Sequence, residues 1–200
     1  MKDPLGRLFP GLPREVRVAL DWLLTIGGAV LIVLALKAWV VNPYKIPSPS
    51  MEPTLHCGRP VPDCEGRYSD RVLANRLIYH FRDPKRGEII VFKTPPEAKL
   101  RCGAGGVFVK RLIGLPGEHV SERDGFVFIN GERLSEPYIK PDRRDHEAPR
   151  AWTVPKGGYF FMGDNRKESC DSRMWGSVPR ANIIGEVFFV YWPPNRIGIR

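Results

Sequence analysis

The chain of 200 residues is long enough for one membrane segment plus one domain of ordinary size, and its 42% hydrophobic content is normal for a globular core. Its 31 Lys and Arg residues exceed its 22 Asp and Glu residues, which gives a formal net charge of +9. The basic residues are scattered, without a basic helix, zinc-finger spacing or aromatic ribonucleoprotein motif, so the composition argues against nucleic-acid binding. The charge instead fits a surface that works beside anionic lipid.

The N-terminal part of the chain predicts a membrane anchor. After the short, mixed-charge segment Met1–Asp21, the residues Trp22–Val41 are mostly apolar. At about 1.5 Å per residue, a helix over this run matches the roughly 30 Å core of a bilayer, and Trp22 and Trp39 lie where interfacial aromatic residues are favoured. We expect a cytoplasmic segment at 1–21, a single transmembrane helix at 22–41 and an extracytoplasmic domain at 42–200.

A cleavable signal peptide is the alternative interpretation of the same run. It would need small residues three positions and one position before the cut, just after the apolar stretch. Leu36 and Ala38 do not meet this requirement, and Gly27 and Ala29 meet it only inside the run. The sequence therefore predicts an anchor that is not cleaved.

From Tyr44 onward, short apolar runs between turn signals predict β-structure. These runs are Arg71–Asn75, Leu77–Phe81, Gly87–Phe92, Gly106–Ile113, Gly158–Met162 and Ile183–Trp192. His119–Ile129 predicts a hairpin that turns at Asp124-Gly125, and Asn130-Gly131 marks a second tight turn. Lys140–Arg150 is a charged loop. The pattern predicts a mainly β domain of coiled antiparallel sheets after one N-terminal transmembrane helix.

The stretch Ile46–Leu55 holds Ser48 and Ser50 among three prolines. Each proline fixes its own φ and favours extended geometry in the residue before it. Such a stiff segment is a poor helix and a poor central strand, but it holds a hydroxyl group at a set point. The alternative interpretation is a rigid linker that leaves the membrane helix.

The strand predicted at 107–113 carries a cation on each face. Its two faces are Phe108, Lys110 and Leu112 on one side, and Val109, Arg111 and Ile113 on the other. Because both faces are apolar, at least one of the two cations is expected among apolar side chains, where burial disfavours the charged form. Arg keeps its proton, whereas burial lowers the pKa of Lys, so Lys110 is a candidate general base. The alternative is a lysine at the rim of the sheet with its amine in water.

The segment Gly163–Gly176 is the third candidate block. It opens with the turn signal Gly163-Asp164-Asn165, after which Ser169, Asp171 and Arg173 alternate and would share one face of an extended backbone. An Asp171–Arg173 pair would brace the loop while Ser169 orients the lysine amine. The alternative is an ordinary polar turn with a solvated ion pair.

Four cysteines stand at positions 57, 64, 102 and 170. The Cys57–Cys64 spacing is wider than that of paired zinc ligands, so we expect no metal site there. In an extracytoplasmic domain we expect a Cys57–Cys64 disulfide, with Cys102 as a competing partner. Four cysteines allow three complete pairings, and the sequence alone does not choose among them.

The candidate blocks, taken together and in order, resemble type I signal peptidases, the membrane-bound Ser/Lys proteases that remove signal peptides from exported proteins. The matching segments are Pro47–Leu55, Asp70–Asn75 with Asp83–Gly87, Lys110–Gly117 and Gly163–Gly176. The resemblance runs from about Pro43 to the end of the chain. Pro49 and Cys170 depart from the family pattern, because small residues are common at both places.

The resemblance implies a role for each residue of these blocks. Ser50 would be the nucleophile, Lys110 the general base, and the Ser48 hydroxyl with the Ser50 backbone N–H the oxyanion hole. Ser169 would orient Lys110. The supporting residues would be Asp171, Arg173, Gly163, Asp164 and Asn165. The substrate would bind as an added β-strand, against walls formed by Tyr44, Ile46, Pro47, Met51, Leu55, Val107, Phe108 and Val109.

The activity that the resemblance implies is cleavage of preproteins after small residues, through an acyl-enzyme and without a cofactor. The expected partners are signal peptides and membrane lipid, and the expected state is a monomer in the cell membrane. Two alternatives stay open: a specialised or self-processing Ser/Lys protease, and an inactive, membrane-tethered β-domain that binds peptides.

Overall fold

The computed structural model describes residues 11, 13–103 and 105–200, and the chain divides into two compact units, Met1–Val41 and Asn42–Arg200. The first unit contains helix α2, Arg14–Trp39. Within it Arg14–Leu34 has a mean hydropathy of 1.9, so by length and composition it is able to cross a membrane. The helix begins eight residues before the predicted Trp22. Residues 1–10 and the Trp39 side chain lie outside the described part.

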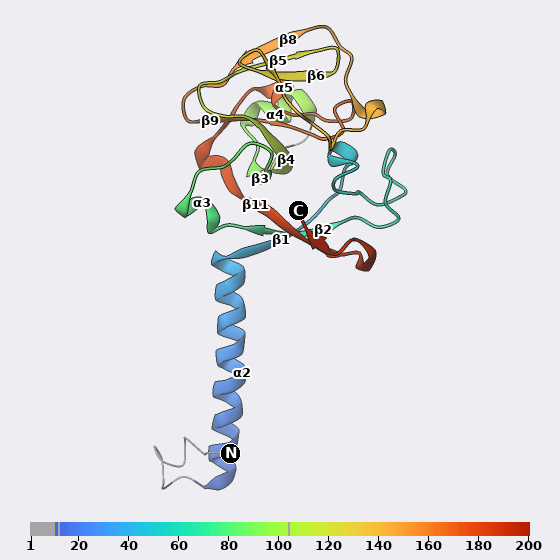
Figure 1. Cartoon of the computed structure of the whole chain (residues 1–200). Coiled ribbons are helices and arrows are strands. Elements are labelled where there is room, and N and C mark those ends of the chain that lie inside the picture. The colour runs from blue at the N-terminus through green and yellow to red at the C-terminus, as the bar shows by residue number, and fades with distance from the viewer. Residues whose placement is uncertain (1–10, 12, 104) are drawn as a thin grey trace. The chain divides into compact units, whose positions relative to one another are not determined.

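The second unit is built from two β-sheets (Figure 1). The large sheet has eight strands: in spatial order β1 (Val41–Lys45), β2 (Arg71–Asn75), β11 (Ile183–Trp192), β3 (Ile89–Lys93), β4 (Val107–Gly114), β9 (Gly158–Met162) and β10 (Val178–Pro179), with β12 (Gly198–Ile199) also paired to β11. The small sheet has the order β7 (Glu132–Arg133), β6 (Phe126–Ile129), β5 (His119–Arg123) and β8 (Arg150–Thr153). The prediction of a mainly β, antiparallel fold after one N-terminal helix is confirmed.

Both predicted tight turns occur in the small sheet. Asp124 and Gly125 have φ values of 53° and 76°, and Asn130 and Gly131 have values of 51° and 90°. Positive φ at both central residues is the signature of the turn that matches the twist of a hairpin, and Asn-Gly and Asp-Gly adopt it most readily. These two turns place β5, β6 and β7 side by side, so the hairpin predictions are confirmed.

One predicted apolar run is a helix instead. Leu77–Phe81, one of the runs that predict β-structure, contains the short helix α3, Ile78–Phe81. The Asn75 side chain accepts hydrogen bonds from the backbone N–H groups of Leu77 and Ile78, which satisfies donors that a strand would have paired with a neighbour. A local turn formed by the Asn75 side chain has therefore overridden the apolar pattern.

The remaining short helices were not predicted. Helix α4, Pro96–Cys102, begins at a proline and is followed by Gly103 in the left-handed conformation, and these residues are favoured at the two positions. The others are α5 (Ser172–Trp175) and the 3₁₀ turns η1 (Pro49–Met51), η2 (Pro141–Arg143), η3 (Arg180–Asn182) and η4 (Pro194–Arg196).

Strand β4 separates the hydrophobic clusters, as the alternation of its side chains requires. Phe108 and Leu112 pack into a cluster with α4, α5 and the stacked rings of Phe92 and Phe161, whose centroids are 4.4 Å apart. Ile113 points into another cluster, with residues of the small sheet. The strand is thus buried on both faces over most of its length.

Two disulfides join parts of the second unit. Cys57 is bonded to Cys64, and Cys102 is bonded to Cys170 across 68 residues of sequence. The predicted Cys57–Cys64 pairing is present, and Cys102, the competing partner in the sequence, takes Cys170 instead.

Gly114 lies at the contact between the two sheets. A Cβ atom there would stand 2.6 Å from Val120 and 2.9 Å from both Val154 and Phe160. Gly114→Ala should therefore lower the free energy of unfolding by about 1–3 kcal/mol through overpacking. Gly198→Ala, another strand position, is the control, because the nearest atom to its new Cβ, from the Arg200 side chain, would lie 3.8 Å away. Denaturant unfolding of both variants measures the difference, and equal stabilities would contradict the proposed packing.

Candidate active site

The turn that carries Ser50 is held by the start of the third sequence block. Within η1, Ser50 is only 7% exposed, and its carbonyl oxygen accepts a hydrogen bond from Asn165 N–H at 3.1 Å. The Asn165 side-chain amide donates to the Pro49 carbonyl oxygen at 3.2 Å. The prolines stiffen this turn and Asn165 fixes it in place, so the Ser50 hydroxyl has a defined position.

Lys110 reaches the same hydroxyl from β4. Its side chain is almost fully buried, and Nζ donates a hydrogen bond to Ser50 Oγ. Burial lowers the pKa of Lys110 to about 8, although the nearby carboxylates of Asp171 and Asp164 raise it. The sequence expectation of a buried lysine with a lowered pKa therefore has the geometry it needs.

Ser48 lies beside this pair. Its Oγ is 3.2 Å from Ser50 Oγ, so one of the two hydroxyls donates to the other. Lys110, Ser50 and Ser48 thus bring one amine and two hydroxyls together at a single point.

These groups open into a cleft of about 360 Å³. Seven of the eight predicted wall residues line it: Tyr44, Ile46, Pro47, Met51, Val107, Phe108 and Val109. Leu55 does not, because it is fully buried in the core against β2, β3 and β11, and its prediction as a wall residue is corrected. Sequence reasoning missed four lining residues, namely Lys45, Cys102, Glu168 and Cys170.

The third block forms a polar corner behind the amine. Asp171 Oδ2 accepts hydrogen bonds from Ser169 Oγ at 2.7 Å and from Gly163 N–H at 3.0 Å. Arg173 donates from Nε to Asp171 Oδ1 at 2.9 Å. Burial raises the pKa of Asp171, but the charge of Arg173 and these hydrogen bonds hold that pKa below its ordinary value. The Asp171–Arg173 pair is present, whereas the supporting role of Asp171 in the site and the contact of Ser169 with the Lys110 amine stay predictions.

The sequence model for the family described as signal peptidase, peptidase S26, matches residues 19–192. The chain belongs to this family. Family membership makes it a serine endopeptidase of the signal peptidase I type.

Two named relatives agree with the assignment. Signal peptidase I of Leptolyngbya laminosa is 39% identical over 188 residues, covering 93% of this chain and 86% of that protein. Probable signal peptidase I-1 of Synechocystis sp. is 41% identical, covering 85% of this chain and 81% of that protein. A crystal structure of a signal peptidase I from Enterococcus faecalis V583 is 37% identical; the match covers 53% of this chain and 97% of that chain, with a TM-score of 0.44.

In this signal peptidase, Asp164 is held by the neighbour of Lys110. Arg111 donates from Nε and Nη2 to the two carboxylate oxygens of Asp164, at 2.8 and 2.6 Å, and from Nη1 to the Gly87 carbonyl oxygen at 2.7 Å. The two cations of β4 thus serve opposite faces: Lys110 meets Ser50, and Arg111 fixes the turn that begins at Gly163. The alternation of side chains in the sequence predicted that the two cations lie on opposite faces of β4. It did not predict that Asp164 is the partner of Arg111.

Several acidic groups of the chain lie close enough for a metal, but their atoms are already engaged. Ligand atoms of Glu52, His56 and Glu65 lie within 4.8 Å of one another. Glu52 is hydrogen-bonded to His56 and to backbone N–H groups, and Glu65 pairs with Lys140 and Arg143. These contacts link the loop after Ser50 to the segment that carries Lys140 and Arg143.

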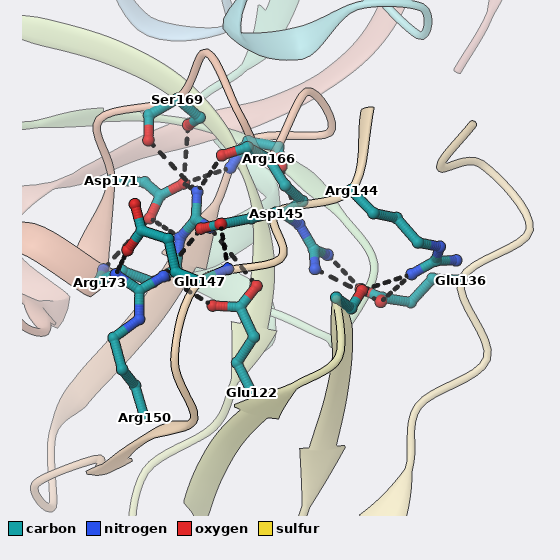
Figure 2. A network of polar contacts seen from close by, with 12 residues as sticks. Glu122, Glu136, Arg144, Asp145, Glu147, Arg150, Arg166, Ser169, Asp171 and Arg173 are labelled. Atoms are coloured by element: carbon teal, nitrogen blue, oxygen red, sulfur yellow. Dashed lines mark hydrogen bonds and ion pairs between the residues drawn. The ribbon is translucent and has the colours of Figure 1, made fainter. Parts of the chain in front are cut away.

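Figure 2 shows the ion network that extends from Arg173. Arg173 Nη1 lies 2.8 Å from Asp145 and 3.4 Å from Glu122, and Arg150 bridges the same two carboxylates. Glu122 belongs to β5 and Arg150 to β8, so the small sheet contacts the corner behind Lys110 through charge. Burial raises the pKa of Glu122 above its ordinary value.

The pair Arg166–Glu136 is the most buried part of this network, with side chains 0% and 1% exposed. Removing one partner leaves the other as an uncompensated buried charge, so Glu136→Ala should lower the free energy of unfolding by about 3–5 kcal/mol. Glu147 pairs with Arg150 at 2.7 Å but is 66% exposed, so Glu147→Ala should change that free energy by less than about 0.5 kcal/mol.

Urea unfolding of the two variants beside the unsubstituted protein measures this contrast. Similar losses for both variants would show that burial of the Arg166–Glu136 pair does not decide its contribution.

Proposed function

We propose that this chain removes N-terminal signal peptides from exported preproteins, with Ser50 as nucleophile and Lys110 as general base. The observation that carries the proposal is the hydrogen bond from the buried Lys110 amine to Ser50 Oγ inside an open cleft. A neutral amine at this place is a suitable base for a serine hydroxyl, which is a weak nucleophile on its own.

The proposed reaction has two halves. Lys110 takes the proton of Ser50 as Oγ attacks the carbonyl carbon after a small side chain, and the Ser48 hydroxyl with the Ser50 backbone N–H binds the oxyanion. The protonated amine then donates its proton to the departing amino group, which becomes the new N terminus of the mature protein. Water activated by Lys110 hydrolyses the acyl-enzyme and releases the signal peptide. Asp164 and Asp171 stabilise the positive charge that Lys110 carries between these steps.

The cleft suits a substrate in extended conformation. The segments Tyr44–Pro47 and Val107–Val109 both line it and both offer extended backbone, so a signal peptide would bind between them as an added strand. Their apolar side chains favour small apolar residues before the cleaved bond. No cofactor takes part in this scheme.

We propose the location from the N-terminal helix. An anchor within 22–41, with residues 1–21 in the cytoplasm and residues 42–200 outside it, would hold the cleft near the membrane lipid, where signal peptides emerge. A single copy of the chain supplies every group that the scheme uses, so we propose that the protein acts as a monomer. The net charge of +9 supports contact with anionic lipid rather than nucleic acid.

Ser50→Ala and Lys110→Met should each abolish cleavage of a preprotein while leaving the fold intact, because each removes one member of the reacting pair. The assay incubates detergent-solubilised protein with a preprotein and sequences the new N terminus. Ser135→Ala and Lys156→Met, at exposed positions, are matched controls that should cleave normally. Substantial processing by either of the first two variants would end the dyad assignment.

The rate should depend on pH through Lys110. Because the base must be neutral, kcat/KM should fall as the pH decreases through about 8, the lowered pKa of the buried amine. A steady-state pH profile of preprotein cleavage measures this limb. A limb near 10.5, the ordinary lysine value, would show that the amine is not desolvated in the working enzyme.

A further inference from the structure

The Cys102–Cys170 disulfide lies at the cleft itself. Both cysteines line the cleft together with Phe108 and Lys110. By contrast, the residues that line the cleft do not include Cys57 or Cys64, although that second disulfide follows the Ser50 turn. The two disulfides of the chain therefore differ in their relation to the site.

One end of this disulfide belongs to the corner behind the amine. Cys170 stands between Ser169 and Asp171, whose side chains share a hydrogen bond of 2.7 Å. A Cβ atom at Gly163 would collide with both Ser169 Oγ and the Ser50 carbonyl oxygen. Gly163 therefore lies tightly between Ser169 and the carbonyl of Ser50, so a displacement of Cys170 would be transmitted through Gly163 to the turn that carries Ser50.

The other end belongs to the cleft wall. Cys102 is the last residue of α4, which precedes the wall strand β4 in the sequence. Cys102, Cys170 and Phe108 pack against one hydrophobic cluster, in which the Phe108 ring lies 5.6 Å from that of Trp175 in an edge-on contact. The bond therefore ties the wall of the cleft covalently to the corner that holds Ser169 and Asp171.

We propose that the Cys102–Cys170 disulfide is a positioning element of the active site, which shapes the wall that contacts the bound signal peptide and fixes the 169–171 segment behind Lys110. This inference rests on the proposed Ser50–Lys110 function. It assigns the two cysteines to substrate binding and to alignment of the base, whereas Cys57–Cys64 stabilises a loop outside the cleft.

The first test compares two double variants of the full-length chain in detergent, Cys102→Ser with Cys170→Ser and, as matched control, Cys57→Ser with Cys64→Ser. The first should lose about tenfold to a hundredfold in kcat/KM, as expected for a misplacement of about 1 Å, through both a higher KM and a lower kcat. The acidic limb of its pH profile should also move, because the surroundings of Lys110 change. The control should keep the kinetic constants and the limb of the unsubstituted enzyme.

A second measurement covers the case in which the first variant folds poorly. The Cys57→Ser, Cys64→Ser protein retains only the Cys102–Cys170 bond, and dithiothreitol reduces that bond to two thiols while itself becoming a cyclic disulfide. This protein should lose activity under dithiothreitol at a temperature where circular dichroism shows it folded, and should regain activity after reoxidation.

Unchanged kcat, KM and pH limb in the Cys102→Ser, Cys170→Ser protein would overturn the proposal. So would a loss of activity that only follows the folded fraction, or full activity of the reduced control protein. The proposed function is tested separately. If Ser50→Ala is active, the Ser50–Lys110 assignment is wrong. If Ser50→Ala is inactive but the Cys102→Ser, Cys170→Ser protein is fully active, only the positioning role of the disulfide is wrong.

Discussion

The hydrogen bond between the buried amine of Lys110 and the hydroxyl of Ser50 is the contact on which the rest of the site depends. A lysine in this position is unfavourable for folding when it is charged. Because burial lowers its pKa from 10.5 to about 8, the unfolded chain binds a proton that the folded chain does not in that pH range, and folding stability falls as the pH decreases from 10.5 to 8. Burial of Lys110 thus lowers the free energy of unfolding in this pH range. The same burial brings the pKa of the amine to about 8, where a neutral base is available.

The surroundings of the amine balance two needs. Desolvation by β4 and its neighbours lowers the pKa of the amine and so favours its neutral form, whereas the buried carboxylates of Asp171 and Asp164 are available to stabilise the cation during the proposed reaction. Each carboxylate has its own arginine, Arg173 or Arg111, so neither has to take the lysine as its only partner. Arg173 also forms ion pairs with Glu122 of the small sheet and with Asp145. The small sheet therefore supports the corner behind Lys110 although none of its strands lines the cleft.

The sequence allowed prediction of those features that local rules determine. The Asp124-Gly125 and Asn130-Gly131 turns and the two-sided burial of β4 followed from turn chemistry and strand alternation. The meeting of the three distant polar blocks was instead implied by the resemblance to type I signal peptidases. The misses have physical causes as well. The Asn75 side chain accepts hydrogen bonds from the backbone where α3 begins, Leu55 is removed from the cleft by core packing, and Cys102 reaches Cys170 over 68 residues of sequence. Such long-range pairings leave no periodic signal in the chain.

The most direct test of the central claim is a titration of Lys110 itself, by NMR of protein labelled at the lysine ε-carbons, with Lys110→Met identifying the resonance. The account predicts that this resonance titrates near pH 8 and moves when Ser50 is changed to Ala, because the two side chains share a hydrogen bond. A Lys110 resonance that titrates near 10.5 and does not respond to Ser50→Ala would contradict it.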